Sequence, residues 1–96
     1  MSEMIAGVEF SDEALNDLRT AIRDEARWRG FTFSIAAMLT HHDELKRMRL
    51  RTLPPDWPRV RLEKWPAHSI WLTEIGGYKI AYLEGKPVHV LYIWEP

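Results

Sequence analysis

The chain has 96 residues, a net charge of −1 and no cysteine. This length supports one domain, and 46% hydrophobic with 28% charged residues exclude a wholly disordered chain. The lack of cysteine excludes disulfides and thiolate metal sites, and it suits a reducing compartment. Because the sequence has neither a long apolar run nor a basic leader followed by an apolar stretch, we expect no signal peptide, no membrane span and a cytoplasmic location.

The first third of the chain predicts a strand followed by a helix. Residues 4–10 are rich in large apolar side chains and form a candidate opening strand. Ser11 is a suitable N-cap, and the two acidic residues that follow it complement the helix dipole. Gly30 is expected to stop this helix. The apolar residues that recur at helical spacing before it are Leu15, Leu18, Ile22 and Ala26.

A second helix is predicted to begin near Thr32 or Ser34. Its apolar side would carry Ile35, Met38, Leu39, His42 and Leu45. A single histidine on an apolar stripe is more often a core or boundary residue than a ligand, and adjacent helical residues point in different directions, so we predict no metal site here. The helix should end before the proline-rich stretch 53–58, at a group of three arginines, Arg47, Arg49 and Arg51.

The last third of the chain predicts three antiparallel strands. Residues 69–75 and 78–83 flank the pair Gly76-Gly77, and a two-residue Gly-Gly loop indicates a hairpin because the turns that match strand twist need positive φ. After a second turn, both alternating sets of side chains in residues 88–94 are largely apolar, so this strand should be central. Residues 59–64 predict a further strand with one polar face. The predicted fold is therefore α+β, with an N-terminal strand and two helices packed on a mainly antiparallel sheet of about four strands.

Positive charge is concentrated in a basic segment, residues 46–64, which contains seven bases and only two acids. Such a segment can face phosphates or an acidic protein, or it can be a solvated helix end followed by a polar strand face. Trp57 lies in its proline-rich loop, and Trp and Arg are enriched in binding hot spots. Trp28, Trp65 and Trp71 suit core or boundary positions. The predicted partner-binding residues are Arg47, Arg49, Arg51, Trp57, Arg59, Arg61 and Lys64.

Two segments of this chain resemble the RelE/ParE superfamily of toxin–antitoxin toxins. Residues 8–18 follow the F-x-x-x-A-x-x-x-L pattern of the family's opening strand and first helix, through Phe10, Ala14 and Leu18. Leu62 and Pro66 are similar to the family's L-x-x-x-P, and residues 77–82, Gly-Tyr-Lys-Ile-Ala-Tyr, are similar to its G-Y-R-[LIV]-x-Y. Residues 31–58 lie outside the match and include a proline-rich insertion. The resemblance implies a single RelE/ParE-like domain over residues 1–96.

RelE-type members of this superfamily cleave mRNA on the ribosome with lysines and arginines, often with a C-terminal tyrosine or histidine, rather than a metal. That chemistry needs a base for the ribose 2′-OH, cations at the transition state and an acid for the leaving 5′-oxygen. Lys79 stands where the family usually has its sheet arginine, so it is the candidate catalytic residue. Residues 70–73 are Ile, Trp, Leu and Thr where a nuclease would have basic side chains, and the chain ends without a basic tail. The resemblance thus implies an incomplete nuclease site.

The sequence supports one favoured functional interpretation and two alternatives to it. A binding toxin of the ParE kind would act on a gyrase-type or ribosomal target without cutting it, and this is the reading that the residues favour. A phage-borne or accessory inhibitor, for example of a CRISPR or other nucleic-acid machine, is the first alternative. A ribosome-dependent, metal-independent endoribonuclease is the second, although a pI near 6.4 is far from the strongly positive field that helps binding to RNA. The expected partners are a cognate antitoxin or a bacterial protein or ribonucleoprotein, with nucleic-acid contact through the basic segment and no cofactor.

Overall fold

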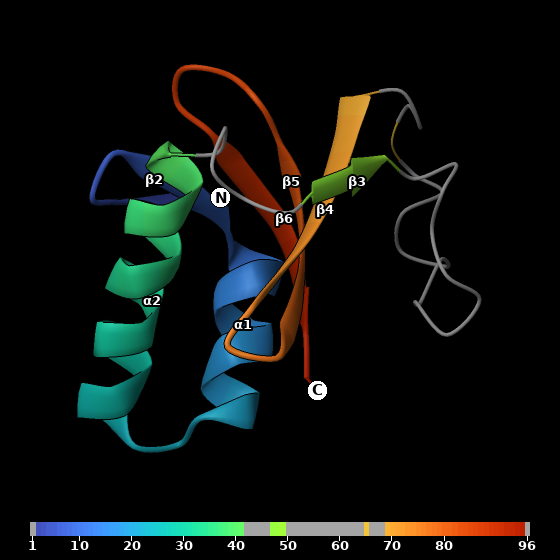
Figure 1. The fold of residues 1–96 in the computed structure, drawn as a ribbon. Coiled ribbons are helices and arrows are strands. Elements are labelled where there is room, and N and C mark those ends of the chain that lie inside the picture. The colour runs from blue at the N-terminus through green and yellow to red at the C-terminus, as the bar shows by residue number, and fades with distance from the viewer. Residues whose placement is uncertain (1, 42–46, 50–64, 66–68, 96) are drawn as a thin grey trace.

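The computed structural model describes residues 2–41, 47–49, 65 and 69–95. Within them, two helices cover one face of a six-stranded sheet whose strand order is β1-β2-β6-β5-β4-β3 (Figure 1). All neighbouring strands are antiparallel except β2 and β6, which are parallel. This arrangement confirms the predicted α+β fold with its mainly antiparallel sheet. The elements are β1 (Ser2–Ile5), β2 (Val8–Ser11), α1 (Asp12–Ala21), α2 (Glu25–Thr40), β3 (Arg47–Arg49), β4 (Ile70–Ile75), β5 (Tyr78–Leu83) and β6 (His89–Trp94).

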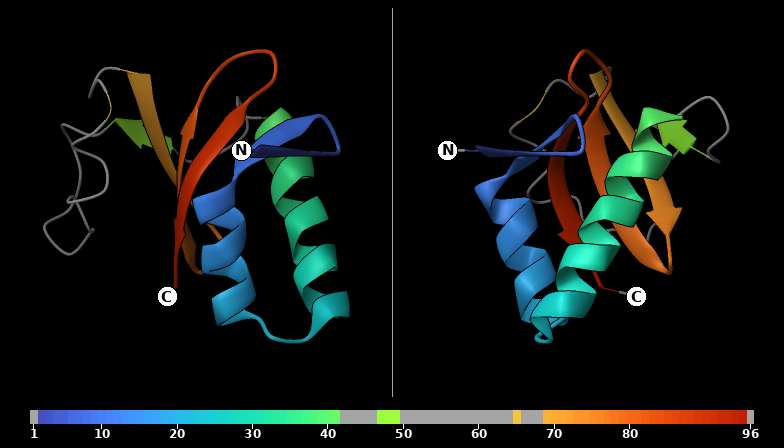
Figure 2. Two further views of the ribbon diagram at one scale, coloured as in Figure 1. Left: turned by 180° about the vertical axis from the view of Figure 1, so that it is seen from behind. Right: turned by 90° about the vertical axis from the view of Figure 1, so that its left-hand side faces the viewer.

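The N-terminal segment forms a β-hairpin, so the prediction of one continuous strand over residues 4–10 is wrong. β1 and β2 pair with Ile5 opposite Val8, and the two residues between them make the turn. Ala6 and Gly7 both have positive φ, of 48° and 80°. Two successive residues with positive φ give the turn whose twist matches paired strands, and Gly7 adopts this conformation without steric penalty. The hairpin projects beside the C-terminal end of α2 (Figure 2).

The two helices begin at the side-chain caps that the sequence provides. Ser11 accepts a hydrogen bond from the Ala14 amide at 3.0 Å and caps α1, as predicted. Asp24 caps α2 in the same way, accepting from the Arg27 amide at 3.0 Å. The predictions that Gly30 stops the first helix and that the second begins near 32 or 34 are therefore wrong. Gly30 lies inside α2, where packing along the helix outweighs a propensity penalty of about 1 kcal/mol.

The inner face of α2 is close to the prediction. Ile35 and Leu39 are fully buried, whereas Met38, placed on the same stripe, is 42% exposed. His42 and Leu45 lie outside the described residues. Arg47 and Arg49 belong to β3 and not to a helix end, because Thr40 is the last residue of α2 and the chain pairs again with β4. No helix of the described part of the chain is long and apolar enough to cross a membrane.

The C-terminal strands confirm the predicted hairpin and the central position of the last strand. Gly76 and Gly77 form the turn between β4 and β5 with φ of 59° and 85°. β6 lies between β2 and β5 and is buried over most of its length, as expected for a strand covered on both faces. The predicted strand 59–64 lies outside the described residues.

Apolar side chains fill both faces of the sheet. On the helix side, the cluster includes Trp28 and also Val8, Phe10, Ala14, Leu15, Leu18, Ile35, Ala36, Leu39, Ile75, Ile80, Tyr82, Val90 and Ile93. On the other face, a smaller cluster contains Ile70, Leu72, Ala81, Leu91 and Tyr92, with Trp65 packed against it. Trp28 is buried and Trp65 and Trp71 are half-buried, which confirms their predicted core or boundary positions.

A β-bulge in β6 interrupts the regular alternation that the sequence suggested. Ala81 pairs with Tyr92 and Tyr82 pairs with Val90, so Leu91 is an extra residue. Leu91 and Tyr92 consequently share one cluster. The Ser11 hydroxyl donates to the Leu91 carbonyl at 2.6 Å, so the residue that caps α1 also forms a hydrogen bond with the bulged residue of β6.

Candidate interaction surfaces

Lys79, the candidate catalytic residue, is on β5 with its side chain only 16% exposed. It lies opposite Glu74 on β4 and opposite Trp94 on β6. Its Nζ is 3.9 Å from Glu74 Oε1, and the Glu74 side chain is 57% exposed. Lys79 is therefore a half-buried, paired cation at the start of a central strand. To act as a general acid or to bind a phosphate, Lys79 would first have to separate from Glu74.

Arg47 and Arg49 occupy different rows of the sheet from Lys79. Arg47 is opposite Thr73 and Arg49 is opposite Trp71. These rows continue through Ile80 and Tyr82, which belong to the helix-side cluster, whereas Lys79 lies one position away from Ile80 along β5. Because successive residues of a strand belong to opposite faces, the register does not bring these two arginine positions into the row of Lys79.

The remaining predicted partner-binding residues are not placed by the structure. Arg51, Trp57, Arg59, Arg61 and Lys64 lie outside the described residues. The structure therefore fixes the backbone of two members of the basic segment, at the sheet edge opposite to β1. The role assigned to this segment stays a prediction.

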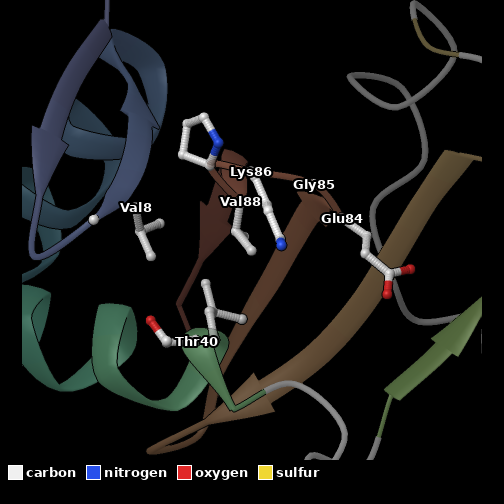
Figure 3. A pocket seen from close by; sticks show the side chains of 9 residues that line it. Val8, Thr40, Glu84, Gly85, Lys86 and Val88 are labelled. Carbon is white, nitrogen blue, oxygen red and sulfur yellow. The ribbon is translucent and has the colours of Figure 1, made fainter.

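One pocket lies where the β1–β2 turn, the end of α2 and the β5–β6 loop meet (Figure 3). Its volume is about 480 Å³, and Val8, Leu39 and Val88 contribute apolar walls. The Lys86 side chain extends into it (Figure 3). Two of the polar side chains here are already bonded within the protein: Glu84 Oε2 accepts from Trp71 Nε1 at 2.9 Å, and Thr40 Oγ1 donates to the Ala36 carbonyl at 2.9 Å. The pocket suits a small apolar group better than acid–base chemistry.

A second groove, of about 360 Å³, separates β1 from the two helices. Met4 and Phe33, which line it, are 56% and 57% exposed. The Arg19 guanidinium lies 4.5 Å from the ring centre of Trp28 at its floor. Sequence reasoning missed this groove because β1 was assigned to a single strand with β2. The one signal available was Gly7, whose positive φ divides the two strands.

No cluster of three or more histidine, aspartate or glutamate side chains suited to a metal ion occurs among the residues that the structure describes. Comparisons with protein-family models, curated proteins and solved structures found no match. The site must therefore be interpreted from its own residues.

Proposed function

We propose that this protein is a RelE/ParE-like toxin-fold protein that acts by binding a bacterial macromolecular target, of gyrase type or ribosomal, without a complete nuclease site. The observation that carries the proposal is the state of Lys79, a half-buried cation paired with Glu74 and separated in register from Arg47 and Arg49. Ribonuclease chemistry without a metal needs several converging cations and proton-transfer groups. A binding protein needs only the fold and a surface.

The arrangement of the two resembling segments supports the superfamily part of the proposal. The first segment forms β2 and α1, and the second includes β5. β6 joins them, because it pairs in parallel with β2 and antiparallel with β5. The segments that resemble the family thus lie on either side of β6, and α1 packs against that strand.

The target surface in this proposal is the basic segment, with Trp57 as its aromatic anchor. Arginine pairs bidentately with carboxylate or phosphate, and a tryptophan in a proline-rich loop loses little entropy on binding. Truncating a central anchor typically costs about 2 kcal/mol or more, which corresponds to roughly a thirtyfold loss of affinity. Rim charges contribute less.

Growth arrest on induction, inhibition of gyrase supercoiling and cleavage of mRNA on programmed ribosomes test the proposal together. We expect arrest or gyrase inhibition that Trp57→Ala and a joint charge reversal of Arg47, Arg49 and Arg51 abolish, with no mRNA cleavage. Lys86→Ala serves as the control, because Lys86 is exposed and remote in sequence from the basic segment.

Two outcomes would contradict the proposal. Equal activity of all variants would place the functional surface elsewhere, with the sheet face around Lys79 as the next candidate. Cleavage of mRNA that disappears in a folded Lys79→Ala variant would establish the nuclease alternative. Circular dichroism of each variant separates loss of function from loss of fold.

A further inference from the structure

The groove beside β1 follows the free edge of that strand. It is lined by Glu3, Met4 and Ile5, three consecutive residues of β1, and by Ala6 of the turn. Successive side chains of a strand point to opposite faces, so a cavity on one face of β1 would meet only alternate residues. Contact with three successive strand residues therefore indicates that the groove runs along the edge. β1 is an end strand of the described sheet, and β2 is its partner there.

The backbone of this edge has groups directed away from β2. In a hairpin with a two-residue turn, the pair next to the turn, here Ile5 and Val8, exchanges hydrogen bonds, and the next pair, Met4 and Glu9, does not. The N–H and C=O of Met4 consequently point away from β2. Unpaired edge groups of this kind form hydrogen bonds with an added strand.

The opposite wall of the groove combines apolar surface with positive charge. Trp28, Thr32 and Phe33 come from α2, together with Arg29, and Arg19 comes from α1. Arg29 is paired with Glu25 at 3.0 Å. Arg19 lies over Trp28 and has no carboxylate within 4.0 Å among the described residues. A ligand that covers Phe33 can therefore also supply the missing carboxylate to Arg19.

We propose that this groove binds an extended segment of a partner protein, added as a strand to β1, with apolar and acidic side chains on the face turned toward the helices. The free edge selects an extended chain, the exposed Met4 and Phe33 select apolar residues, and Arg19 selects an acidic one. β1 precedes the residues that carry the RelE/ParE resemblance and is remote from the basic segment. This inference therefore stands independently of the proposed function, and the two can fail separately.

Fluorescence anisotropy with a labelled peptide tests the inference on the full-length protein. The probe is a peptide with the repeat Thr-Val-Thr-Glu. In an extended chain, one face of this peptide carries threonine and the other carries valine and glutamate alternately. We expect binding that weakens as salt is added, because an Arg–carboxylate pair at the surface is screened. Two control peptides are used, and neither should bind. The first carries lysine in place of glutamate. The second keeps the same valine and glutamate content in an alanine-rich helical sequence.

Matched variants locate the binding surface. Met4→Pro removes the outward N–H without removing a bond to β2, and Arg19→Glu reverses the unpaired charge. Each should weaken peptide binding about tenfold or more, and Phe33→Ala should weaken it less severely. Met38→Ala and Arg27→Glu are exposed changes on α2 outside the groove and should leave binding unchanged.

Hydrogen exchange in the unmodified protein provides a readout that does not depend on a variant folding. The Met4 amide should exchange quickly in the free protein and become protected when the peptide binds. The inference is overturned if the acidic peptide does not bind at millimolar concentration, if the lysine or helical peptide binds equally well, or if Met4 gains no protection. Self-association that Met4→Pro abolishes would assign the groove to a second copy of the chain and would also overturn it.

Discussion

Ser11 joins two distant parts of the fold, and replacing it tests how that junction contributes to stability. Its hydroxyl oxygen accepts from the Ala14 amide at 3.0 Å and its O–H donates to the Leu91 carbonyl at 2.6 Å. Leu91 is the extra residue of the bulge in β6 and is only 1% exposed. One side chain thus completes the first turn of α1 and donates to a main-chain carbonyl of the bulged strand.

The Ser11→Ala change should lower the free energy of unfolding by the sum of two losses. Removing an N-cap side chain typically costs about 1 kcal/mol. Leaving a buried acceptor without a donor costs about 1–3 kcal/mol. We therefore expect a loss of about 2–4 kcal/mol, because the two effects act at different atoms.

Asp24→Ala is the matched control for this prediction. Asp24 caps α2 with the same geometry, at 3.0 Å from the Arg27 amide, but it is exposed and makes no bond to the sheet. Its loss should cost only about 1 kcal/mol. Ser11→Thr keeps the hydroxyl and should stay close to the unmodified protein. Urea unfolding followed by tryptophan fluorescence measures all three variants. Equal losses for Ser11→Ala and Asp24→Ala, with unchanged m-values, would refute the contribution of the bulge bond.

Two further pairs of variants test the helix boundary and the packing. Gly30→Ala should stabilise the protein by about 0.5–1 kcal/mol, because Gly30 is inside α2 and a Cβ there meets nothing within 4 Å. Gly76→Ala should destabilise it by about 1–2 kcal/mol, because φ is 59° and the new Cβ would lie 3.0 Å from the Phe31 ring. Thermal melts measure both, and a stabilising Gly76→Ala would contradict the turn geometry. Ile35→Ala should cost about 2–5 kcal/mol and Met38→Ala less than about 0.5 kcal/mol, because Ile35 is fully buried and Met38 is 42% exposed. Similar losses in urea unfolding would show that the buried face of α2 is misassigned.

Of the candidate sites, the sequence identified residue types but not their relative positions. Lys79 is recognisable from its Gly-Tyr-Lys context, yet its pairing with Glu74 depends on the register between β4 and β5. The rows occupied by Arg47 and Arg49 depend in the same way on the pairing of β3 with β4. The groove beside β1 has no short motif, since its walls come from a strand and two helices.

The sequence by itself determined the features that depend on local interactions. The Gly76-Gly77 turn, the cap at Ser11 and the apolar strands on either side of the turn need only the preferences of neighbouring residues, and all three are present. Those signals were sufficient for two helices on a mainly antiparallel sheet, because an apolar strand and an amphipathic helix have few other ways to bury their surfaces.

Tertiary structure decided the features that depend on contacts between distant residues. Gly30 remains helical because α2 buries Trp28 and Ile35 on either side of it against the sheet, and this packing outweighs the weak preference of one glycine to end a helix. The bulge at Leu91 follows from pairing between β5 and β6, and its carbonyl is satisfied from Ser11, 80 positions earlier. Pairing register and burial are properties of the assembled sheet, so a pattern read along one segment does not specify them.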